Sequence, residues 1–111
     1  MLIEFDKIEM TVLQNFKGGD GELCANMFTD ENNKILFGRL SPSSSIGMHP
    51  HDDGSEIIYI LKGKGCVLFD DTKELLIEGS CHYCPMGHSH SLINDSDEDL
   101  IFFAVVPVHT A

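Results

Sequence analysis

The sequence predicts an all-β domain, either a sandwich or a small barrel. Short runs rich in Val, Ile, Phe, Tyr and Leu recur along the chain, and clusters of Gly, Asp, Asn, Pro and Ser separate them about every 8 to 12 residues. The sequence shows little of the amphipathic periodicity that is typical of helices. A chain of 111 residues can enclose one hydrophobic core but is too short for two. We therefore expect residues 1–111 to form a single domain.

The N-terminal half of the chain is expected to contain five strands. Each is a run with apolar residues, and each ends at a cluster in which residues such as glycine, proline, asparagine or aspartate favour a turn. The five strands cover 9–16, 22–29, 33–41, 46–51 and 56–62. The turns between them cover 17–21, 30–33, 42–45 and 52–55.

The C-terminal half is expected to contain five more strands, which are shorter on average. They cover 65–70, 73–78, 81–84, 88–94 and 99–107. Gly63 and Gly65 flank a tight hairpin, while Gly79 and Gly87 each stand before a strand. All four are positions where a positive φ is expected, since glycine adopts it without steric cost.

Two of these strands lack polar alternation. Residues 57–61 read IIYIL and residues 100–106 read LIFFAVV. A strand of this kind is expected to be buried on both faces, between the barrel interior and a second layer. The second layer can be another subunit, so we expect a homodimer.

The charge balance narrows the classes of partner. The chain carries 18 acidic and 7 basic residues, for a formal charge of -11. The negative electrostatic field of such a chain repels nucleic acids and anionic membranes, so small molecules and metal cations are the expected partners. No run reaches the ~18 apolar residues of a spanning helix, and the start of the chain carries acidic residues where an export signal needs basic ones. A cytoplasmic location is expected.

The four cysteines are expected to be free thiols. They are Cys24, Cys66, Cys81 and Cys84. A reducing compartment disfavours disulfides, and Cys81 and Cys84 lack the second pair that a zinc ribbon requires. We expect small strand residues packed in or near the barrel wall, and the sequence leaves open a redox or metal role for Cys81 and Cys84.

Histidine is the residue type that indicates chemistry. Five of the six histidines lie within residues 49–90. His49 and His51 alternate in an extended segment and so point to the same face, and Glu56 opens a strand that is otherwise apolar. His90 lies on a later strand. Three imidazoles and one carboxylate make a mixed nitrogen and oxygen site suited to one divalent transition metal, namely Mn, Fe, Co, Ni, Cu or Zn.

Other polar residues are candidates for proton transfer or substrate binding beside the metal. His88 shares the parity of His90, so His88 is a candidate proton shuttle, and Tyr59 is a candidate acid. Tyr83 and Glu74 are weaker candidates, whereas His82 and His109 are expected at the rim or surface. Arg39 is the only arginine and could hold a substrate carboxylate, although an arginine paired at the surface or at an interface is equally compatible with its strand.

The metal candidates lie in a pattern that resembles the cupin family. The series His49-x-His51, four residues, Glu56, six residues, Gly63 is similar to the first cupin motif. The series Gly79, five residues, Pro85-x-Gly87, two residues, His90, three residues, Asn94 is similar to the second. One position departs from the first motif: Ser43 stands where a glycine usually precedes the first histidine by six residues. Asn94 is expected to bond to backbone at a turn.

The resemblance implies a small β-barrel of jelly-roll type, with the metal-binding core at about residues 40–107. By resemblance the metal is held by His49, His51, Glu56 and His90, which we call the four-ligand cluster. Cupins include dioxygenases, isomerases, decarboxylases and lyases, so the resemblance does not fix a reaction. Two functions remain open at this point: a metal-dependent enzyme acting on a small polar metabolite, and a non-catalytic module that binds or senses one in the same pocket.

Overall fold

The computed structural model describes residues 1–109, and within them the chain is built almost entirely from strands. The strands are β1 (Thr11–Gln14), β2 (Glu22–Thr29), β3 (Asn33–Leu40), β4 (His49–Pro50), β5 (Glu56–Lys62), β6 (Gly65–Phe69), β7 (Thr72–Leu76), β8 (Cys81–Cys84), β9 (Ser89–Ile93) and β10 (Leu100–Pro107). Two single 3-10 turns, η1 (Phe5–Lys7) and η2 (Phe16–Gly18), flank β1.

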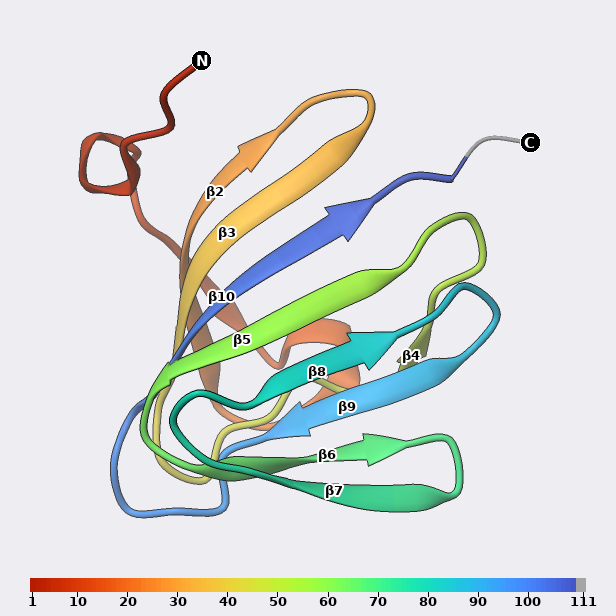
Figure 1. Cartoon of the computed structure of the whole chain (residues 1–111). Helices are drawn as coiled ribbons and strands as arrows, with labels where there is room; N and C mark the ends of the chain where they lie inside the picture. Colours follow the sequence, from red (N-terminus) through yellow and green to blue (C-terminus); the bar gives the residue numbers. More distant parts are fainter. Residues whose placement is uncertain (110–111) are drawn as a thin grey trace.

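The strands form two antiparallel sheets that face each other across the core (Figure 1). The larger sheet has the order β1-β2-β3-β10-β5-β8, and the smaller has the order β4-β9-β6-β7. Strands that are adjacent in the sheets are often distant in the chain, since β10 lies between β3 and β5, and β9 lies between β4 and β6. This is the all-β jelly-roll barrel expected from the sequence.

The core is built from the inward positions of both sheets. In β10 the side chains of Leu100, Phe102 and Ala104 are buried, while the alternate positions are half-buried. Gly38 of β3 lies beneath the Phe102 ring, and a Cβ at Gly38 would come 2.5 Å from the Cζ atom of that ring. The missing side chain at Gly38 therefore makes room for a phenylalanine in the barrel interior.

The expected strands correspond in order to the observed ones, with the largest difference in the segment 46–51. Only His49–Pro50 is a strand there, although Ile46 donates its N–H to the Leu92 carbonyl oxygen at 2.8 Å. The N–H of Gly47 instead donates to the carbonyl oxygen of Phe16, 3.0 Å away in the η2 turn. Pairing with β9 is therefore interrupted, and β4 is short.

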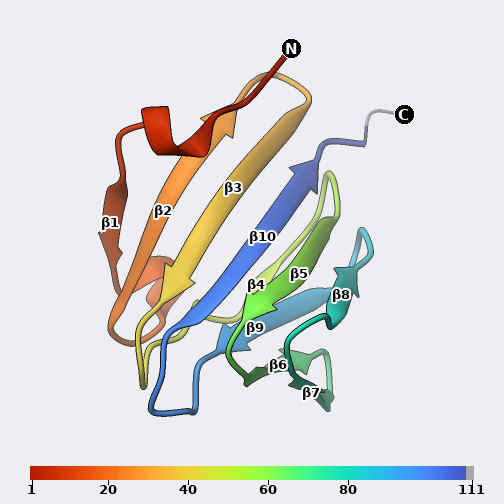
Figure 2. The same ribbon diagram turned by 60° about the vertical axis from the view of Figure 1, so that its left-hand side comes forward.

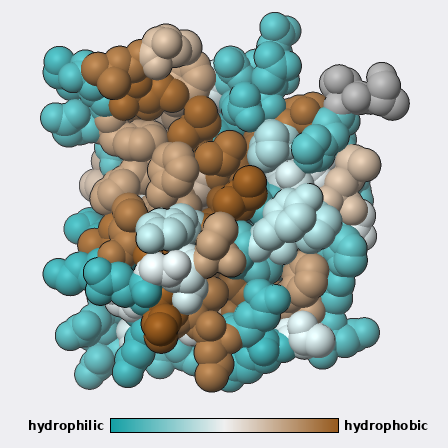
Figure 3. Space-filling view, in the orientation of Figure 1, coloured by the Kyte–Doolittle hydropathy of each residue, from teal (hydrophilic) through white to brown (hydrophobic). Residues whose placement is uncertain are grey.

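The expectation that two strands are buried on both faces is wrong for this chain taken by itself. The outer face of β5 carries Ile57, Tyr59 and Leu61, which are 40%, 43% and 38% exposed. On β10, Phe103 is half-buried because Phe5 packs on it and on Phe37, with ring centroids 6.2 and 6.1 Å apart. Figure 2 shows the N-terminal segment beside this sheet, and Figure 3 shows hydrophobic side chains gathered over its middle.

Within the described residues, no helix has the length and apolar character needed to cross a membrane.

Candidate metal centre

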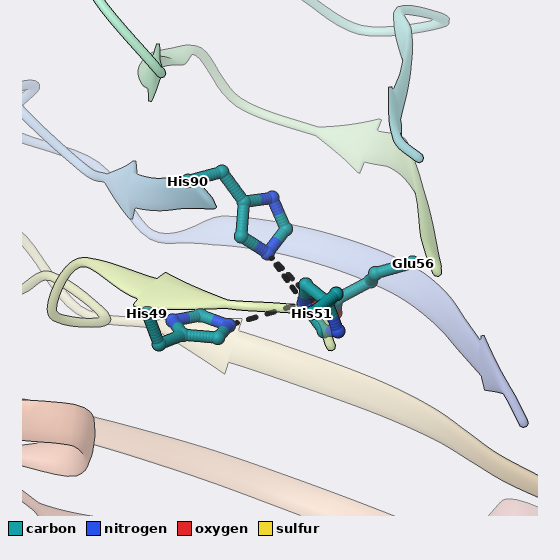
Figure 4. Close-up of side chains that lie close together, drawn as sticks. All are labelled: His49, His51, Glu56 and His90. Carbon is teal, nitrogen blue, oxygen red and sulfur yellow. Dashed lines mark hydrogen bonds and ion pairs between the residues drawn. The ribbon is translucent and has the colours of Figure 1, made fainter. Parts of the chain in front are cut away.

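The four-ligand cluster is assembled from three strands and one loop. His49 begins β4 and stands directly opposite His90 of β9, while His51 follows β4 and Glu56 begins β5. One ligand atom from each of the four residues lies within 4.8 Å of all the others. Figure 4 shows the four side chains pointing toward one another. The structure thus brings together the residues that the sequence singles out as ligands.

Backbone hydrogen bonds hold His51 in place in the loop that follows β4. The N–H of His51 donates to the carbonyl oxygen of His88 at 3.0 Å, and the N–H of Gly87 donates to the carbonyl oxygen of His51 at 2.6 Å. Pro50 between the two histidines fixes one backbone angle. The alternation of His49 and His51 is therefore kept even though β4 itself has only two residues.

A single carboxylate oxygen lies at the middle of the cluster. The Oε1 atom of Glu56 is 2.9 Å from Nε2 of His90, 3.1 Å from Nε2 of His51 and 3.8 Å from Nε2 of His49. The Nε2 atoms of His51 and His90 are themselves 3.0 Å apart. All three imidazoles therefore present the same ring nitrogen to the same small volume.

The other ring nitrogens show that this donor set fits a cation. Nδ1 of His49 lies 2.7 Å from the carbonyl oxygen of Gly47, which can only accept, so Nδ1 carries the proton. In the neutral ring Nε2 then has a free lone pair that faces Glu56. Imidazole nitrogens and a carboxylate oxygen converging in this way form the kind of site that transition metals occupy.

A chain of hydrogen bonds continues from the cluster through the barrel wall. Nδ1 of His90 is 3.0 Å from Nε2 of His82, and Nδ1 of His82 is 2.7 Å from Oε1 of Glu74. The carboxylate of Glu74 accepts from His82, which leaves Nε2 of His82 to accept from His90 and Nε2 of His90 free for a cation. The expectation of a rim or surface position for His82 is wrong: its side chain is 0% exposed, because its strand β8 turns it inward.

Burial and hydrogen bonding have opposite effects on the acid in the cluster. Burial raises the pKa of the Glu56 carboxyl, but hydrogen bonds from the imidazoles of His49, His51 and His90 in their protonated form together outweigh it, and the pKa lies well below its ordinary value. For His90, burial lowers the pKa and the nearby Glu56 offsets this only in part. A charged carboxylate beside a neutral imidazole is the protonation state in which both coordinate a cation.

The cluster opens into a cavity of about 420 Å³. His49, His51 and Glu56 line one part of it, and most of the remaining wall is apolar. The charged residues in the rest of the lining are Lys17, Lys34, Asp52 and Asp53. The two aspartates belong to the turn expected at 52–55, where they could also draw cations toward the site, while the sequence pattern assigns no role to the lysines. Lys34 has the parity of the inward residues Leu36, Gly38 and Leu40, which is the signal that could have revealed it.

The residues suggested for proton transfer or substrate binding beside the metal lie outside the cavity. His88 is exposed, and its Nδ1 is 2.6 Å from Oδ2 of Asp70. Tyr59 and Arg39 both occupy outer positions of their strands, and the guanidinium of Arg39 lies 4.0 Å from a carboxylate oxygen of Asp99. None of these three lines the cavity. The arrangement therefore matches the surface alternative for Arg39.

All four cysteines are free. Cys24, Cys66 and Cys84 are buried, whereas Cys81 is exposed. Cys81 and Cys84 are three residues apart on β8, so their side chains leave opposite faces of the sheet. They therefore do not form a joint redox or metal site in this fold.

The remaining motif residues have structural roles. Ser43, at the position where a cupin glycine is usual, has a φ of 64°, so the loop keeps the left-handed conformation that glycine favours. Gly63, Gly79 and Gly87 have positive φ as expected, but Gly65 does not. A Cβ at Gly65 would lie 2.5 Å from the carbonyl oxygen of Ile93, so close approach explains that glycine.

Asn94 bonds to backbone, as the sequence suggested. Its side-chain amide donates to the carbonyl oxygens of Leu40 and Glu98, at 2.8 and 2.7 Å, and its Oδ1 accepts from Ser96. These bonds satisfy a fully buried polar side chain next to the last loop of the chain. Asn94 is therefore a residue of the fold and not of the cavity.

Comparisons with known proteins agree with this geometry. A family model described as a cupin domain matches residues 36–106. An oxalate-binding protein of Thermotoga maritima is 37% identical over an alignment of 113 positions, which covers 96% of this chain and 93% of that protein.

Solved structures give the same result for the fold. A crystal structure described as a predicted oxalate decarboxylase from Thermotoga maritima superposes with a TM-score of 0.90 at 28% identity, covering 97% of this chain and 99% of that one. A cupin 2 conserved barrel protein from Salinispora arenicola superposes with a TM-score of 0.74 at 21% identity, covering 96% and 87%. Together with the match of the family model over most of the barrel, this shows that the chain belongs to the cupin family.

Proposed function

We propose that this protein binds one divalent transition metal through the four-ligand cluster and uses the metal to bind a small carboxylate metabolite. The observation that carries the proposal is the convergence of three imidazole nitrogens and one carboxylate oxygen within 4.8 Å, at the wall of a cavity of about 420 Å³. The tautomers assigned to His49 and His90 suit coordination, because each leaves Nε2 free for a cation. The cavity gives a small molecule access to the same atoms.

The donor set defines the class of metal. Imidazole with one carboxylate favours Mn, Fe, Co, Ni, Cu or Zn over Ca and Mg, which prefer oxygen alone. Four protein ligands fill a tetrahedral site but leave two positions free in a six-coordinate one. When bound, such an ion supplies a Lewis-acid centre to which a chelating molecule can attach.

The comparisons support a carboxylate as the ligand. The Thermotoga maritima relative with 37% identity is named an oxalate-binding protein. Two oxygens of a chelating carboxylate match the two free positions of a six-coordinate ion. Since His88 and Tyr59 lie outside the cavity, the chain supplies neither of the candidate proton-transfer groups to a bound molecule. On this ground we propose ligand binding as the function, although Asp52, Asp53 and Lys34 also line the cavity.

We also propose a homodimer formed through the outer face of the larger sheet. Ile57, Tyr59 and Leu61 form a partly exposed apolar row on β5, and Tyr83 of the neighbouring β8 extends it with 56% exposure. Contiguous apolar patches of this kind mark interfaces more often than free surface. A second copy of the chain is the partner that the sequence of these strands predicts.

The test starts with elemental analysis of protein purified without a histidine tag. One equivalent of a transition metal per chain is expected. Calorimetric titration of the loaded protein with oxalate should then give saturable binding that disappears after treatment with EDTA. Absence of a metal-binding equivalent, or oxalate binding that survives metal removal, would contradict the proposal. Carbon dioxide release from oxalate by the same preparation would show turnover and so contradict a purely binding role.

A further inference from the structure

We infer that the molecule this centre binds most tightly is a carboxylate with an apolar body, such as a branched or aromatic 2-oxo acid, in preference to oxalate. The inference rests on the proposed function, because it takes the four-ligand cluster as the place where the carboxylate end binds. It adds the chemistry of the other end of the ligand, which the rest of the cavity determines.

The lining of the cavity is sharply divided. The metal-ligating side chains contribute one part of the wall. The rest consists mainly of apolar side chains from β1, η2, β2, β3, the loop before β4, and β10. They include Leu13, Phe16, Met27, Leu36, Phe102 and Val106. A molecule that filled the cavity would place a polar end at the cluster and an apolar surface against the inner face of the larger sheet.

The size of the cavity argues against a ligand as small as oxalate. Its volume of about 420 Å³ lies within the range of about 300–1,000 Å³ that is usual for small-molecule sites. Oxalate is two joined carboxylates and nothing more, so it would leave most of the apolar wall in contact with water. Ligand pockets of this volume usually hold larger molecules, with apolar walls around a few polar groups.

The charged residues that line the cavity outside the cluster have no net formal charge. Lys17 and Lys34 line the cavity, but Asp52 and Asp53 line it as well, so these four formal charges cancel. Lys17 is exposed, and its Nζ atom lies 5.5 Å from the centroid of the Phe16 ring. Because apolar side chains make up most of the wall and its other charges balance, a ligand with one carboxylate and an apolar body suits this cavity.

β1 offers a matched pair of positions for testing this. Leu13 lines the cavity, while the adjacent Val12 is 48% exposed on the other face of the same edge strand. Leu13→Gln places an amide against the ligand's apolar body, whereas Val12→Gln changes the same strand without touching the cavity. Met27→Gln, on β2, repeats the test at a second wall position should Leu13→Gln lower the yield of folded protein.

The experiment uses protein loaded with one equivalent of Co²⁺ and three probes titrated by calorimetry: oxalate, pyruvate and 4-methyl-2-oxopentanoate. The last two share one chelating head and differ only in apolar carbons. We expect 4-methyl-2-oxopentanoate to bind at least tenfold more tightly than pyruvate, because burial of each added methylene favours binding. Leu13→Gln should reduce that advantage about three- to tenfold with the pyruvate affinity unchanged, and Val12→Gln should leave both affinities unchanged.

Two results would overturn the inference while leaving the proposed function in place. One is oxalate or pyruvate binding as tightly as 4-methyl-2-oxopentanoate. The other is an unchanged preference in folded Leu13→Gln and Met27→Gln proteins. If the Co²⁺-loaded protein bound none of the three acids, the proposed function itself would fail, and the inference with it.

Discussion

Nε2 of His82 lies 3.0 Å from Nδ1 of His90, and this contact determines which nitrogen of His90 faces the four-ligand cluster. Glu74 accepts from the far side of His82 at 2.7 Å, so the direction of both hydrogen bonds is fixed from the carboxylate inward. Groups that bond to the second nitrogen of a ligating histidine commonly hold its ring and its tautomer. His82 is thus a positioning residue for His90.

Replacing His82 by Ala should lower metal affinity by roughly 10- to 100-fold without removing a ligand, because the His90 ring loses its orienting partner. Glu74→Gln should have a smaller effect of the same sign. Competition with a chromophoric chelator measures both. His88→Ala is the control, since His88 is exposed and bonds Asp70, and it should leave affinity unchanged. Equal effects of His82→Ala and His88→Ala would refute the role assigned to His82.

Replacing a ligand should be more severe. His51→Ala or His90→Ala should abolish stoichiometric metal binding, and the rise in Tm that added metal produces should disappear with it, because an ion that binds only the folded chain stabilises it. Elemental analysis and thermal unfolding with and without metal measure the two effects. His109→Ala, at an exposed position beside Ser55, is the matched control. A full equivalent of metal in both ligand variants would show that the assignment is wrong.

Acid should weaken metal binding and also destabilise the metal-free protein. Coordination needs neutral imidazole, so apparent affinity should fall as the pH drops below about 6.5. Burial lowers the pKa of His90 in the folded chain, so the unfolded chain takes up its proton first and stability decreases as the pH falls below about 6.5.

The lowered pKa of Glu56 has an effect of the same sign at lower pH. The stability that it contributes is present above about 4.5, the usual value for the unfolded chain, and is lost as the pH falls further. Metal titrations and thermal unfolding of the metal-free protein between about pH 7.5 and 4 measure these effects. A flat metal affinity between about pH 7.5 and 5 would contradict an imidazole site.

The apolar row on β5 should make the protein dimeric. Light scattering at micromolar concentration should give twice the mass of the chain, and Tyr59→Glu should give a monomer, because it places a charge in the middle of the row. Leu75→Glu is the control, since Leu75 is 78% exposed on β7 of the other sheet. A monomeric wild-type protein would exclude the proposed dimer.

Arg39→Lys should leave metal and ligand binding unchanged, because the side chain of Arg39 lies outside the cavity. The same elemental analysis and calorimetric titrations measure this.

The cysteines should differ in reactivity. Burial raises the pKa of the Cys84 thiol to about 11, and the nearby carboxylate of Glu56 adds to this effect. Since the thiolate is the reactive form, iodoacetamide at pH 8 should label exposed Cys81 first and reach Cys84 only after unfolding. Mass spectrometry of the labelled peptides measures this, and Cys81→Ser should remove the fast phase. Rapid labelling of Cys84 in folded protein would disagree with its position.

The alternation of apolar and polar residues and the spacing of the two motifs were enough to predict the barrel and the proximity of the four ligands. His49 and His51 are two apart in an extended segment, so their common direction follows from strand geometry alone. His82 could not be placed in this way. Its strand reads CHYC, and either face of such a short run can be buried. The pairing of His82 with Ile58 of β5 decides the matter, because it turns His82 toward the core.

Arg39 was undecidable for a related reason. Both faces of its strand are otherwise apolar or small, so parity does not say which face meets the core. The structure decides it through Phe102, whose ring occupies the space above Gly38 and so makes the face of Leu36, Gly38 and Leu40 the inner one. This relationship joins residues more than sixty positions apart, and no local pattern contains it.

The four-ligand cluster does not belong to one sheet. His49 and His90 lie in the smaller sheet, while Glu56 begins a strand of the larger one. An ion bound to all of them would cross-link the two sheets, which are otherwise held together by side-chain packing. Opening the barrel would then require release of the ion. The metal-loaded protein should therefore be digested by proteases and unfold much more slowly than its gain in equilibrium stability alone would suggest.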